Sequence, residues 1–513
     1  MFTFPCNAGH LDVATSLSRS TVAEKHLEIE RKYDAAPDFT LPDLTGLPGV
    51  IAVSGTERHT LSANYFDTAD LRLAAHGITL RRRRGGEDAG WHLKMPAGPD
   101  SKQELRAPLG RAQVVPARLA TLVTAYARGS ELGRVAVLDT ERTTVRLLGE
   151  DGAVLAEIAD DAVSGRVEGA ESADTWREIE VELVSGDRAL LKAADKALRK
   201  AGAEPGSSAS KLGRVLGDAV TRRAVARTHP GSAAEAVLDY LSAQVTAIVT
   251  GDPKARLAED DAVHKMRVAV RRTRSTLKSC RRVLDRERTD PLQPELKWLA
   301  DALGEVRDLE VLRMRFADRI AGLDELTGEA EEAGRHLLDR LTGDEQAAYR
   351  RLDAALKEPR YYALLDALEG LVAEPPLAGK AGRPADDELP RMLDREWRRV
   401  EKAYAAIADA DDPDEARHDT RKVAKRARYA AELARPVVGS SAKQMVADAK
   451  RIQEVFGGYQ DGVIAMEHLH DAARRAETPA EAFVLGVLYG VERTEAYTSR
   501  DHVEETWEQI TGS

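Results

Sequence analysis

The alternation of polar and apolar residues divides the chain into two parts with different periods. Between Ser62 and Asp139, short segments alternate with a period of two and are separated by clusters of Gly, Pro and Asp. This pattern is typical of an antiparallel sheet. After Thr228 the chain changes to long segments rich in Ala, Leu, Arg and Glu, which favour helices. The pattern predicts an α+β protein with a sheet in its first half and only helices in its second.

Two helices are expected within the first half, at residues 113–129 and 187–200, because their apolar residues recur at helical spacing. Strands resume at 135–139, 142–148 and 154–160, and the segment Trp176–Leu183 alternates strictly. At 513 residues the chain exceeds one ordinary domain, since about 100 to 200 residues per domain is typical. We predict a disordered extension at 1–22, a first domain at 23–218, a linker at 219–231 and a second domain at 232–507.

The stretch Glu28-Ile29-Glu30-Arg31-Lys32 carries the first chemical signal. In a strand, residues 28, 30 and 32 share one face, so two carboxylates and an ammonium stand in a row. Taken alone, this segment is compatible with a functional face and equally with a solvated edge strand of alternating charge.

The other predicted strands repeat this arrangement. Arg81 and Arg83 share a face, and Trp176–Leu183 places its carboxylates opposite Ile179 and Val181. A closed barrel would turn the aliphatic rows toward covering helices and the charged rows into a lumen. A lumen that mixes many cations with several carboxylates requires a multiply charged anion and a metal. Arginine and lysine bind phosphate, and clustered carboxylates suit a hard divalent cation, so the residues indicate metal-bridged polyphosphate binding.

These segments together resemble the CYTH domain of the triphosphate tunnel metalloenzymes over nearly all of residues 24–216. The matching motifs are Glu28-x-Glu30-x-Lys32, Tyr65-Phe66-Asp67-Thr68, Leu80-Arg81-x-Arg83, Trp91-x-Leu93-Lys94, Glu178-Ile179-Glu180 and Ser210-Lys211. The resemblance implies an eight-stranded antiparallel tunnel with flanking helices, which hydrolyses triphosphates with Mg²⁺ or Mn²⁺.

The resemblance also implies roles for individual residues. Phosphate oxygens would be held by Lys32, Arg81, Arg83, Lys94, Arg106, Arg142 and Lys211. The metal would be held by Glu28, Glu30, Asp160, Glu178 and Glu180. Glu28, Glu30 and Lys32 would form the catalytic row, in which water attacks a terminal phosphoryl group with metal assistance. The alternative for each cation is an ion pair at the rim of the barrel.

The second half contains an internal duplication. The segment His264–Arg274 matches His418–Arg428 at an offset of 154 residues, and Leu303–Asp308 matches Phe456–Asp461 at an offset of 153. A loop rich in Pro and Gly at 374–384 separates the copies, which we place at about 232–373 and 388–507. Two copies of one helical unit explain the match.

Each copy carries a basic stripe along one helix. His264, Arg267, Arg271 and Arg274 fall within an arc of about 80°, and so do His418, Arg421, Lys425 and Arg428. Like charges at this spacing repel, so an extended polyanion is the natural partner. Pairing with acidic residues of neighbouring helices is the alternative.

The duplicated motifs resemble the CHAD domain. This resemblance implies two pseudo-symmetric four-helix bundles and a basic surface that binds inorganic polyphosphate. The predicted polyphosphate-binding residues are the eight stripe residues together with Lys297 and Lys450. The histidines have no Cys or His partners at metal-ligand spacing, so phosphate contact or helix packing is favoured over metal binding.

Composition narrows the class of protein. The formal net charge is −11, and no run of about 20 apolar residues occurs, so no membrane span is expected. The two cysteines argue against a disulfide framework and for a reducing compartment. With no secretory signal in the first 20 residues, the expected location is the cytoplasm.

The sequence therefore predicts a metal-dependent hydrolase of triphosphate or polyphosphate, with inorganic, nucleoside or thiamine triphosphate as possible substrates. A non-catalytic polyphosphate-binding adapter is one alternative, and a use of the tunnel like that of an adenylate cyclase is another. Nucleic acid binding ranks last, because the basic stripes lack the interleaved aromatic residues that stack on bases.

Overall fold

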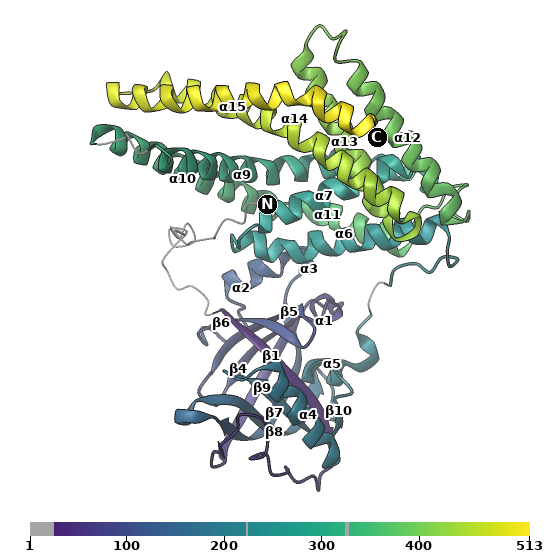
Figure 1. The fold of residues 1–513 in the computed structure, drawn as a ribbon. Coiled ribbons are helices and arrows are strands. Elements are labelled where there is room, and N and C mark those ends of the chain that lie inside the picture. Colours follow the sequence, from purple (N-terminus) through teal and green to yellow (C-terminus); the bar gives the residue numbers. More distant parts are fainter. Residues whose placement is uncertain (1–24, 222–223, 324–327, 513) are drawn as a thin grey trace. The chain divides into compact units, whose positions relative to one another are not determined.

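The computed structural model describes residues 25–221, 224–323 and 328–512, which form two compact units, one of strands and one of helices (Figure 1). The predicted extension at 1–22 lies outside the described residues. The predicted linker at 219–231 lies between the last helical turn of the first unit and helix α6, which begins at Ala233.

The first unit is a closed antiparallel barrel, as predicted. In the described part of the chain, eight long strands pair in the order β1-β6-β5-β4-β3-β7-β8-β9, and β9 returns to β1. Short strands β2 and β10 pair with β7 and β1. The strands are β1 (Lys25–Ala35), β2 (Ala52–Val53), β3 (Glu57–Asp67), β4 (Thr79–Arg84), β5 (Gly90–Gly98), β6 (Ser101–Ala107), β7 (Gly133–Leu148), β8 (Val154–Val167), β9 (Asp174–Leu183) and β10 (Glu204–Pro205).

Two local predictions differ from the structure. The segments at 135–139 and 142–148 belong to one continuous strand, β7. The helix predicted at 113–129 is divided into α2 (Ala117–Leu122) and α3 (Thr124–Ala127). Helix α3 stops where Arg128 and then Gly129 adopt positive φ angles of 51° and 78°, a conformation that cannot continue a right-handed helix.

The aliphatic rows of the strands face helices outside the barrel. Ile179 and Val181 of β9 are fully buried in a cluster with Leu190 and Leu191 of α4 (Arg188–Lys200). The carboxylate of Asp187 caps this helix by accepting the N–H of Leu190. Burial of one face of β9 by α4 leaves its charged face directed into the barrel.

Asp67 in the Tyr65–Thr68 motif has a structural task. Its buried carboxylate accepts the backbone N–H groups of Leu73 and Ala74, each at 2.9 Å, at the start of α1 (Arg72–Ala75). It also accepts the N–H of Thr68 at 2.7 Å. Asp67 thus holds the connection between β3 and β4, which places Arg81 and Arg83.

The second unit consists of helices that pack in sequence order within each copy. α6 packs on α7, α7 on α9 and α9 on α10, while α12, α13, α14 and α15 repeat this order. The copies meet where α7 packs on α13 and α10 on α15. The helices are α6 (Ala233–Arg256), α7 (Ala262–Ser279), α8 (Arg286–Thr289), α9 (Leu292–Ala321), α10 (Glu329–Ala355), α11 (Pro359–Ala373), α12 (Ala385–Ala405), α13 (Pro413–Val438), α14 (Ser440–Ala473) and α15 (Pro479–Thr511).

This arrangement agrees with the predicted all-helical second half. The loop at 374–384 lies between α11 and α12, at the boundary between the copies. Among the described residues, no helix combines the length and the apolar character needed to cross a bilayer.

Candidate functional site

A charged cavity of about 240 Å³ lies inside the barrel. Its walls come from all eight long strands of the barrel and from the start of α5 (Lys211–Leu216). The predicted residues among its lining are Glu28, Glu30, Lys32, Arg81, Arg83, Lys94, Arg106, Arg142, Glu180 and Lys211. Glu178 joins them through Lys211, so the structure gathers eleven of the twelve predicted barrel residues.

Strand register explains why these residues meet. β1 pairs with β6 in its first half, where Glu28 lies opposite Lys102, and with β9 in its second half, where Lys32 lies opposite Glu180. Because side chains alternate along a strand, Glu28, Glu30 and Lys32 of β1 all point into the lumen. β1 therefore links two charged strands that are far apart in sequence.

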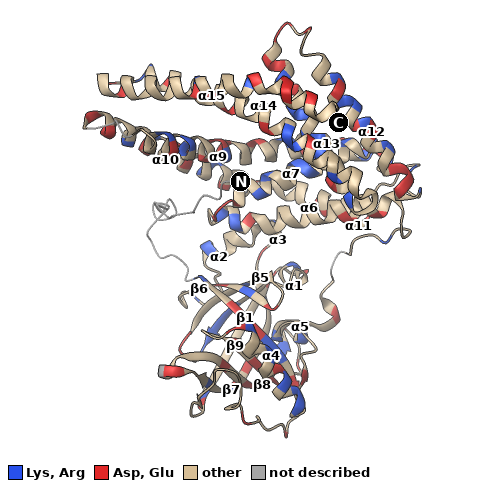
Figure 2. Cartoon of the chain, in the orientation of Figure 1, with Lys and Arg blue, Asp and Glu red and all other residues tan. Residues whose placement is uncertain are grey.

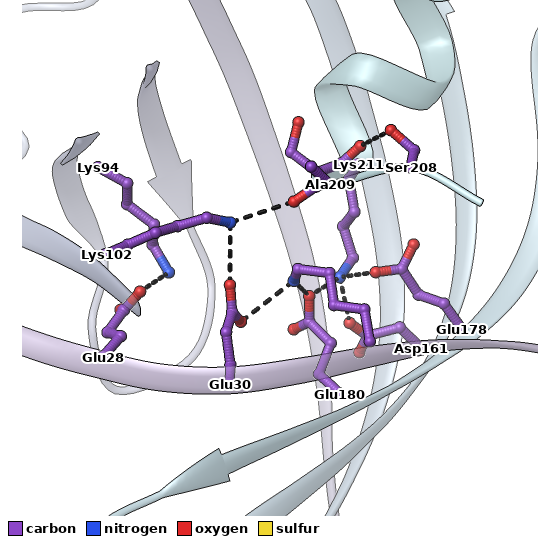
Figure 3. Close-up of polar contacts among 12 residues, drawn as sticks. Glu28, Glu30, Lys94, Lys102, Asp161, Glu178, Glu180, Ser208, Ala209 and Lys211 are labelled. Carbon is purple, nitrogen blue, oxygen red and sulfur yellow. Dashed lines mark hydrogen bonds and ion pairs between the residues drawn. The ribbon is translucent and has the colours of Figure 1, made fainter. Parts of the chain in front are cut away.

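Lysines neutralise the acidic row of β1. The ammonium of Lys94 lies 2.6 Å from Glu28, and that of Lys102 lies 3.0 Å from Glu30 (Figure 3). Lys32 lies 3.1 Å from Glu30 and also contacts Glu180. Such charges tolerate burial because each is paired.

Three carboxylates converge beside this row. Asp161, Glu178 and Glu180 each offer one oxygen within 4.8 Å of the others. The ammonium of Lys211 lies 2.8, 2.7 and 2.8 Å from them, respectively (Figure 3). Arg142 also donates to Asp161 and Glu180, at 2.6 and 2.8 Å. A cluster of carboxylate oxygens fits a hard divalent cation such as Mg²⁺ or Mn²⁺.

The structure corrects the position of one predicted metal ligand. Asp160 lies on the opposite face of β8 and forms an ion pair with Arg177 at 2.7 Å, away from the lumen. Its neighbour Asp161 is fully buried in the carboxylate cluster and lies opposite Arg142 in the strand register. Because successive side chains of a strand alternate, an error of one residue moves the side chain to the other face.

Sequence reasoning also missed Lys102 and Glu104, both of which line the cavity. A signal was present, because 102, 104 and 106 share a face of β6 when the period of two is extended from Arg106. Glu104 contacts Arg106, Lys94 and His92, the last at 2.9 Å. For Asp161 the comparable signal was Glu157, which lies four residues earlier on the same face of β8.

The environment of the lumen separates the pKa values of its carboxylates. Burial alone would raise the pKa of Glu30, but Lys32 and the neighbouring lysines outweigh it and lower the pKa to about 2. Burial raises the pKa of Glu28 despite Lys94. Burial and the nearby charge of Glu28 raise the pKa of Glu182 to about 7. The lumen therefore holds ionised carboxylates beside others that bind a proton more readily.

Arg81 and Arg83 of β4 bring two buried guanidinium groups into the lumen, where Arg83 also pairs with Asp88. Burial, together with Arg81 and Arg142, lowers the pKa of Arg83 to about 9. The Nε atoms of Arg81 and Arg83 are buried, and neither has a hydrogen-bond partner among the described residues. Buried donors without acceptors are costly, and an anion such as phosphate would satisfy them.

The helical unit contains a second basic cluster, formed where α7 packs on α13. Figure 2 shows Lys and Arg along both helices. Arg271 of α7 lies in the field of Arg421 and Arg428 of α13, and Lys425 lies in that of Arg267 and Arg271. Burial and these cations lower the pKa of Lys425 to about 6. The structure thus joins the two predicted stripes into one cluster, which we call the α7–α13 cluster.

Equivalent contacts hold one arginine of each copy. Arg267 donates to Asp308 at 2.8 Å, and Arg421 donates to Asp461 at 3.3 Å. A Cβ added at Gly304 would lie 3.1 Å from the Arg267 guanidinium, and one at Gly457 would lie 3.0 Å from that of Arg421. These contacts explain the matching Gly-x-x-x-Asp motifs: the glycine makes room for the guanidinium and the aspartate fixes it.

The remaining predicted residues of the helical unit differ in their surroundings. His264 and His418 are partly buried, and burial with nearby cations lowers the pKa of each. The buried Nε atom of Arg274 has no hydrogen-bond partner among the described residues, and that of Arg428 lies 3.5 Å from Glu432. Lys297 and Lys450 are exposed and pair locally with Asp301 and Glu454, two turns before Gly304 and Gly457 on α9 and α14.

The barrel and its charged lumen define a protein of the triphosphate tunnel class. A CYTH domain matches residues 26–216 and a CHAD domain matches residues 239–470. The chain belongs to the family of proteins that join an N-terminal CYTH domain to a C-terminal CHAD domain.

Relatives of the whole chain occur in Mycobacterium tuberculosis. The protein Rv2226 of strain H37Rv is 38% identical over 504 residues, which cover 94% of this chain and 95% of the relative. Among solved structures, PptA from Streptomyces chartreusis is 25% identical with a TM-score of 0.45, covering 54% of this chain and 99% of its own. The CHAD domain from the plant Ricinus communis is 22% identical with a TM-score of 0.46, covering 57% and 96%.

Proposed function

We propose that the barrel is a metal-dependent hydrolase of phosphoanhydride bonds in triphosphate or polyphosphate, and that the helical unit binds inorganic polyphosphate. One observation supports the first part most strongly. One cavity is lined both by Glu180 of the carboxylate cluster and by Arg81 and Arg83, whose buried Nε atoms have no hydrogen-bond partner among the described residues. This combination suits a polyanion that arrives together with a divalent cation.

The residues in and beside the cavity would have different roles, because carboxylates bind metal ions and arginines and lysines bind phosphate. Asp161, Glu178 and Glu180 would hold Mg²⁺ or Mn²⁺, with Glu30 close by through Lys32. When bound, the metal supplies positive charge against the phosphoryl oxygens. Arg81, Arg83 and Arg106, which line the same cavity, would bind phosphoryl oxygens. Lys32 and Lys94 would hold the chain between them.

Glu28 is the best placed group to orient the attacking water. Its carboxylate lines the cavity, and its raised pKa makes it a better proton acceptor than an ordinary glutamate. Water would attack the terminal phosphorus, the bond from that phosphorus to the bridging oxygen would break, and the shortened chain would leave on that oxygen. Arginines fixed before the reaction meet the charge that spreads over the phosphoryl oxygens.

For the helical unit, the α7–α13 cluster supports polyphosphate binding. Its cations come from both copies and lie close enough to repel one another when no anion is bound. An extended chain of phosphates matches a row of charges better than a compact anion does.

Phosphate release tests the proposal. Wild-type protein should release phosphate from inorganic triphosphate with Mg²⁺ or Mn²⁺, and a chelator should abolish the release. The substrate panel should include long polyphosphate, thiamine triphosphate and ATP, with cyclic AMP measured in the ATP samples. No metal-dependent release from any substrate would refute the hydrolase and leave a polyphosphate-binding adapter. Cyclic AMP formation would favour the cyclase instead.

A further inference from the structure

The ammonium of Lys211 stands at the centre of the carboxylate cluster. It contacts Asp161, Glu178 and Glu180 at 2.7 to 2.8 Å, and their oxygens lie within 4.8 Å of one another. A divalent cation held by the same three carboxylates would need oxygens about 2.0 to 2.6 Å away. The metal and the ammonium therefore compete for the same oxygens.

We infer that, in the metal-free protein, the ammonium of Lys211 occupies the position of the metal. A divalent cation must displace this ammonium before it can bind the three carboxylates. This inference rests on the proposed metal-dependent function of the barrel and goes beyond it. In the free protein the lysine neutralises a cluster that would otherwise be costly to bury. The protein therefore keeps its metal site stable while it is without metal.

The backbone of Lys211 is fixed, but its side chain is able to move. The hydroxyl of Ser210 caps α5 by accepting the N–H of Gly213 at 3.0 Å, and Leu212 and Val215 are buried against the barrel. The four methylene groups of lysine allow the ammonium to swing while the backbone stays in place. Lys211 itself lines the cavity, so the space beside it is lumen.

A displaced ammonium would enter a lumen that already holds Arg81 and Arg142. Without an anion this position is unfavourable, because like charges repel in a confined space. A phosphoryl oxygen in the lumen removes that penalty. The metal should therefore bind weakly alone and more readily with its phosphate, because Lys211 changes partners from carboxylate to phosphate in the same event.

Two nearby residues make the inference testable without turnover. Trp176 donates its indole N–H to Glu178 at 2.7 Å, so its fluorescence reports on the cluster. Lys102 is a matched control, because it lines the same cavity but contacts Glu30 and the Ala209 carbonyl, at 3.0 and 3.2 Å. Loss of either lysine removes one positive charge from the lumen, but of these two lysines Lys211 alone contacts the carboxylate cluster.

The experiment is a titration of the full-length protein with Mn²⁺ alone, without phosphate, followed by calorimetry and tryptophan fluorescence. Lys211→Met should bind Mn²⁺ about tenfold more tightly than wild type, whereas Lys102→Met should change the affinity less than about threefold. Trp176→Phe should remove the fluorescence change and leave the calorimetric affinity in place.

Unchanged or weaker Mn²⁺ binding by Lys211→Met, or an equal gain in Lys102→Met, would overturn the inference. Circular dichroism and the melting temperature check that each variant folds. If Lys211→Met does not fold, Lys211→Gln replaces it, because its amide still donates to the carboxylates without a charge. Tighter Mn²⁺ binding in a protein that hydrolyses nothing would sustain the inference while refuting the proposed hydrolase.

Discussion

The barrel lumen and the α7–α13 cluster both concentrate cations, but they stabilise them differently. In the lumen most cations contact carboxylates, as in the pairs Lys94–Glu28 and Lys102–Glu30. In the α7–α13 cluster, Arg267 and Arg421 each have one aspartate and Arg428 lies near Glu432, while most of the charges that act on Lys425 are positive. The comparison suggests different tasks: a site with both charges suits metal and phosphate together, and a site with mainly positive charge suits phosphate alone.

The largest expected difference between the barrel lumen and the α7–α13 cluster comes from the removal of one carboxylate in the lumen. Glu180 contacts Lys32, Arg142 and Lys211, so Glu180→Gln unbalances the lumen and weakens any metal site there. We expect phosphate release from triphosphate to fall by about a hundredfold or more, with polyphosphate affinity of the helical unit unchanged. Phosphate release and polyphosphate pull-down measure the two effects. Glu168→Gln, at an exposed pair with Arg134, serves as the control.

The duplicated arginines offer a test of the symmetry within the helical unit. Arg267→Ala and Arg421→Ala should each lower polyphosphate affinity about five- to tenfold and by similar amounts, because their contacts are equivalent. Each should also reduce the dependence of affinity on salt concentration, as expected when one cation is lost from a polyanion site. Strongly unequal losses would show that one copy carries the binding. Arg286→Ala, whose side chain is exposed, is a control.

The pH dependence of polyphosphate affinity should show whether protonated Lys425 contributes to binding. In the free protein its pKa is about 6, so it is mostly neutral at pH 8 and gains its proton as the pH falls toward 6. Phosphate favours the charged form, so binding takes up a proton and affinity rises as the pH falls from 8 to 6. Lys425→Arg, which stays charged, should bind more tightly at pH 8 and show a flatter profile. Equal profiles for the two proteins would argue against this role.

The smallest expected effect is on stability and comes from Glu182. Its pKa is about 7 in the folded protein and near 4.5 in an unfolded chain. A raised pKa gives stability that is complete below about pH 4.5 and is lost as the pH rises through 7. For metal-free protein, Glu182→Gln should therefore raise the melting temperature at pH 8 more than at pH 5. Asp139→Asn, at an exposed residue of β7, is the control variant.

The barrel and most of the residues in its lumen could be predicted from the sequence, because the charged residues recur with a period of two. Glu28, Glu30 and Lys32 could be assigned to one face with no knowledge of their partners. Asp160 could not be distinguished from Asp161 in this way, because adjacent aspartates fall on opposite faces and the choice depends on the pairing with β7. Alternation orders the residues within a strand, whereas register between strands is a tertiary property.

In the helical unit, too, the contacts between elements could not be predicted from the sequence. The duplicated stripes were visible as a repeat, but the contact between α7 and α13 depends on how the copies pack. The Gly-x-x-x-Asp motifs were visible too, yet only the structure shows that Gly304 faces the Arg267 guanidinium. Asp67 was recognised within a motif, but only the structure shows that its carboxylate accepts the backbone N–H groups of Leu73 and Ala74.

The pairing of β1 with both β6 and β9 has a consequence for biogenesis. Glu30 lies opposite Glu182, so the barrel closes only when the ribosome has released the chain beyond its ninth strand. Contacts between residues so distant in sequence slow the approach to the native state. Until then the acidic and basic rows remain hydrated and apart, and the charged lumen forms only in the last step of closure.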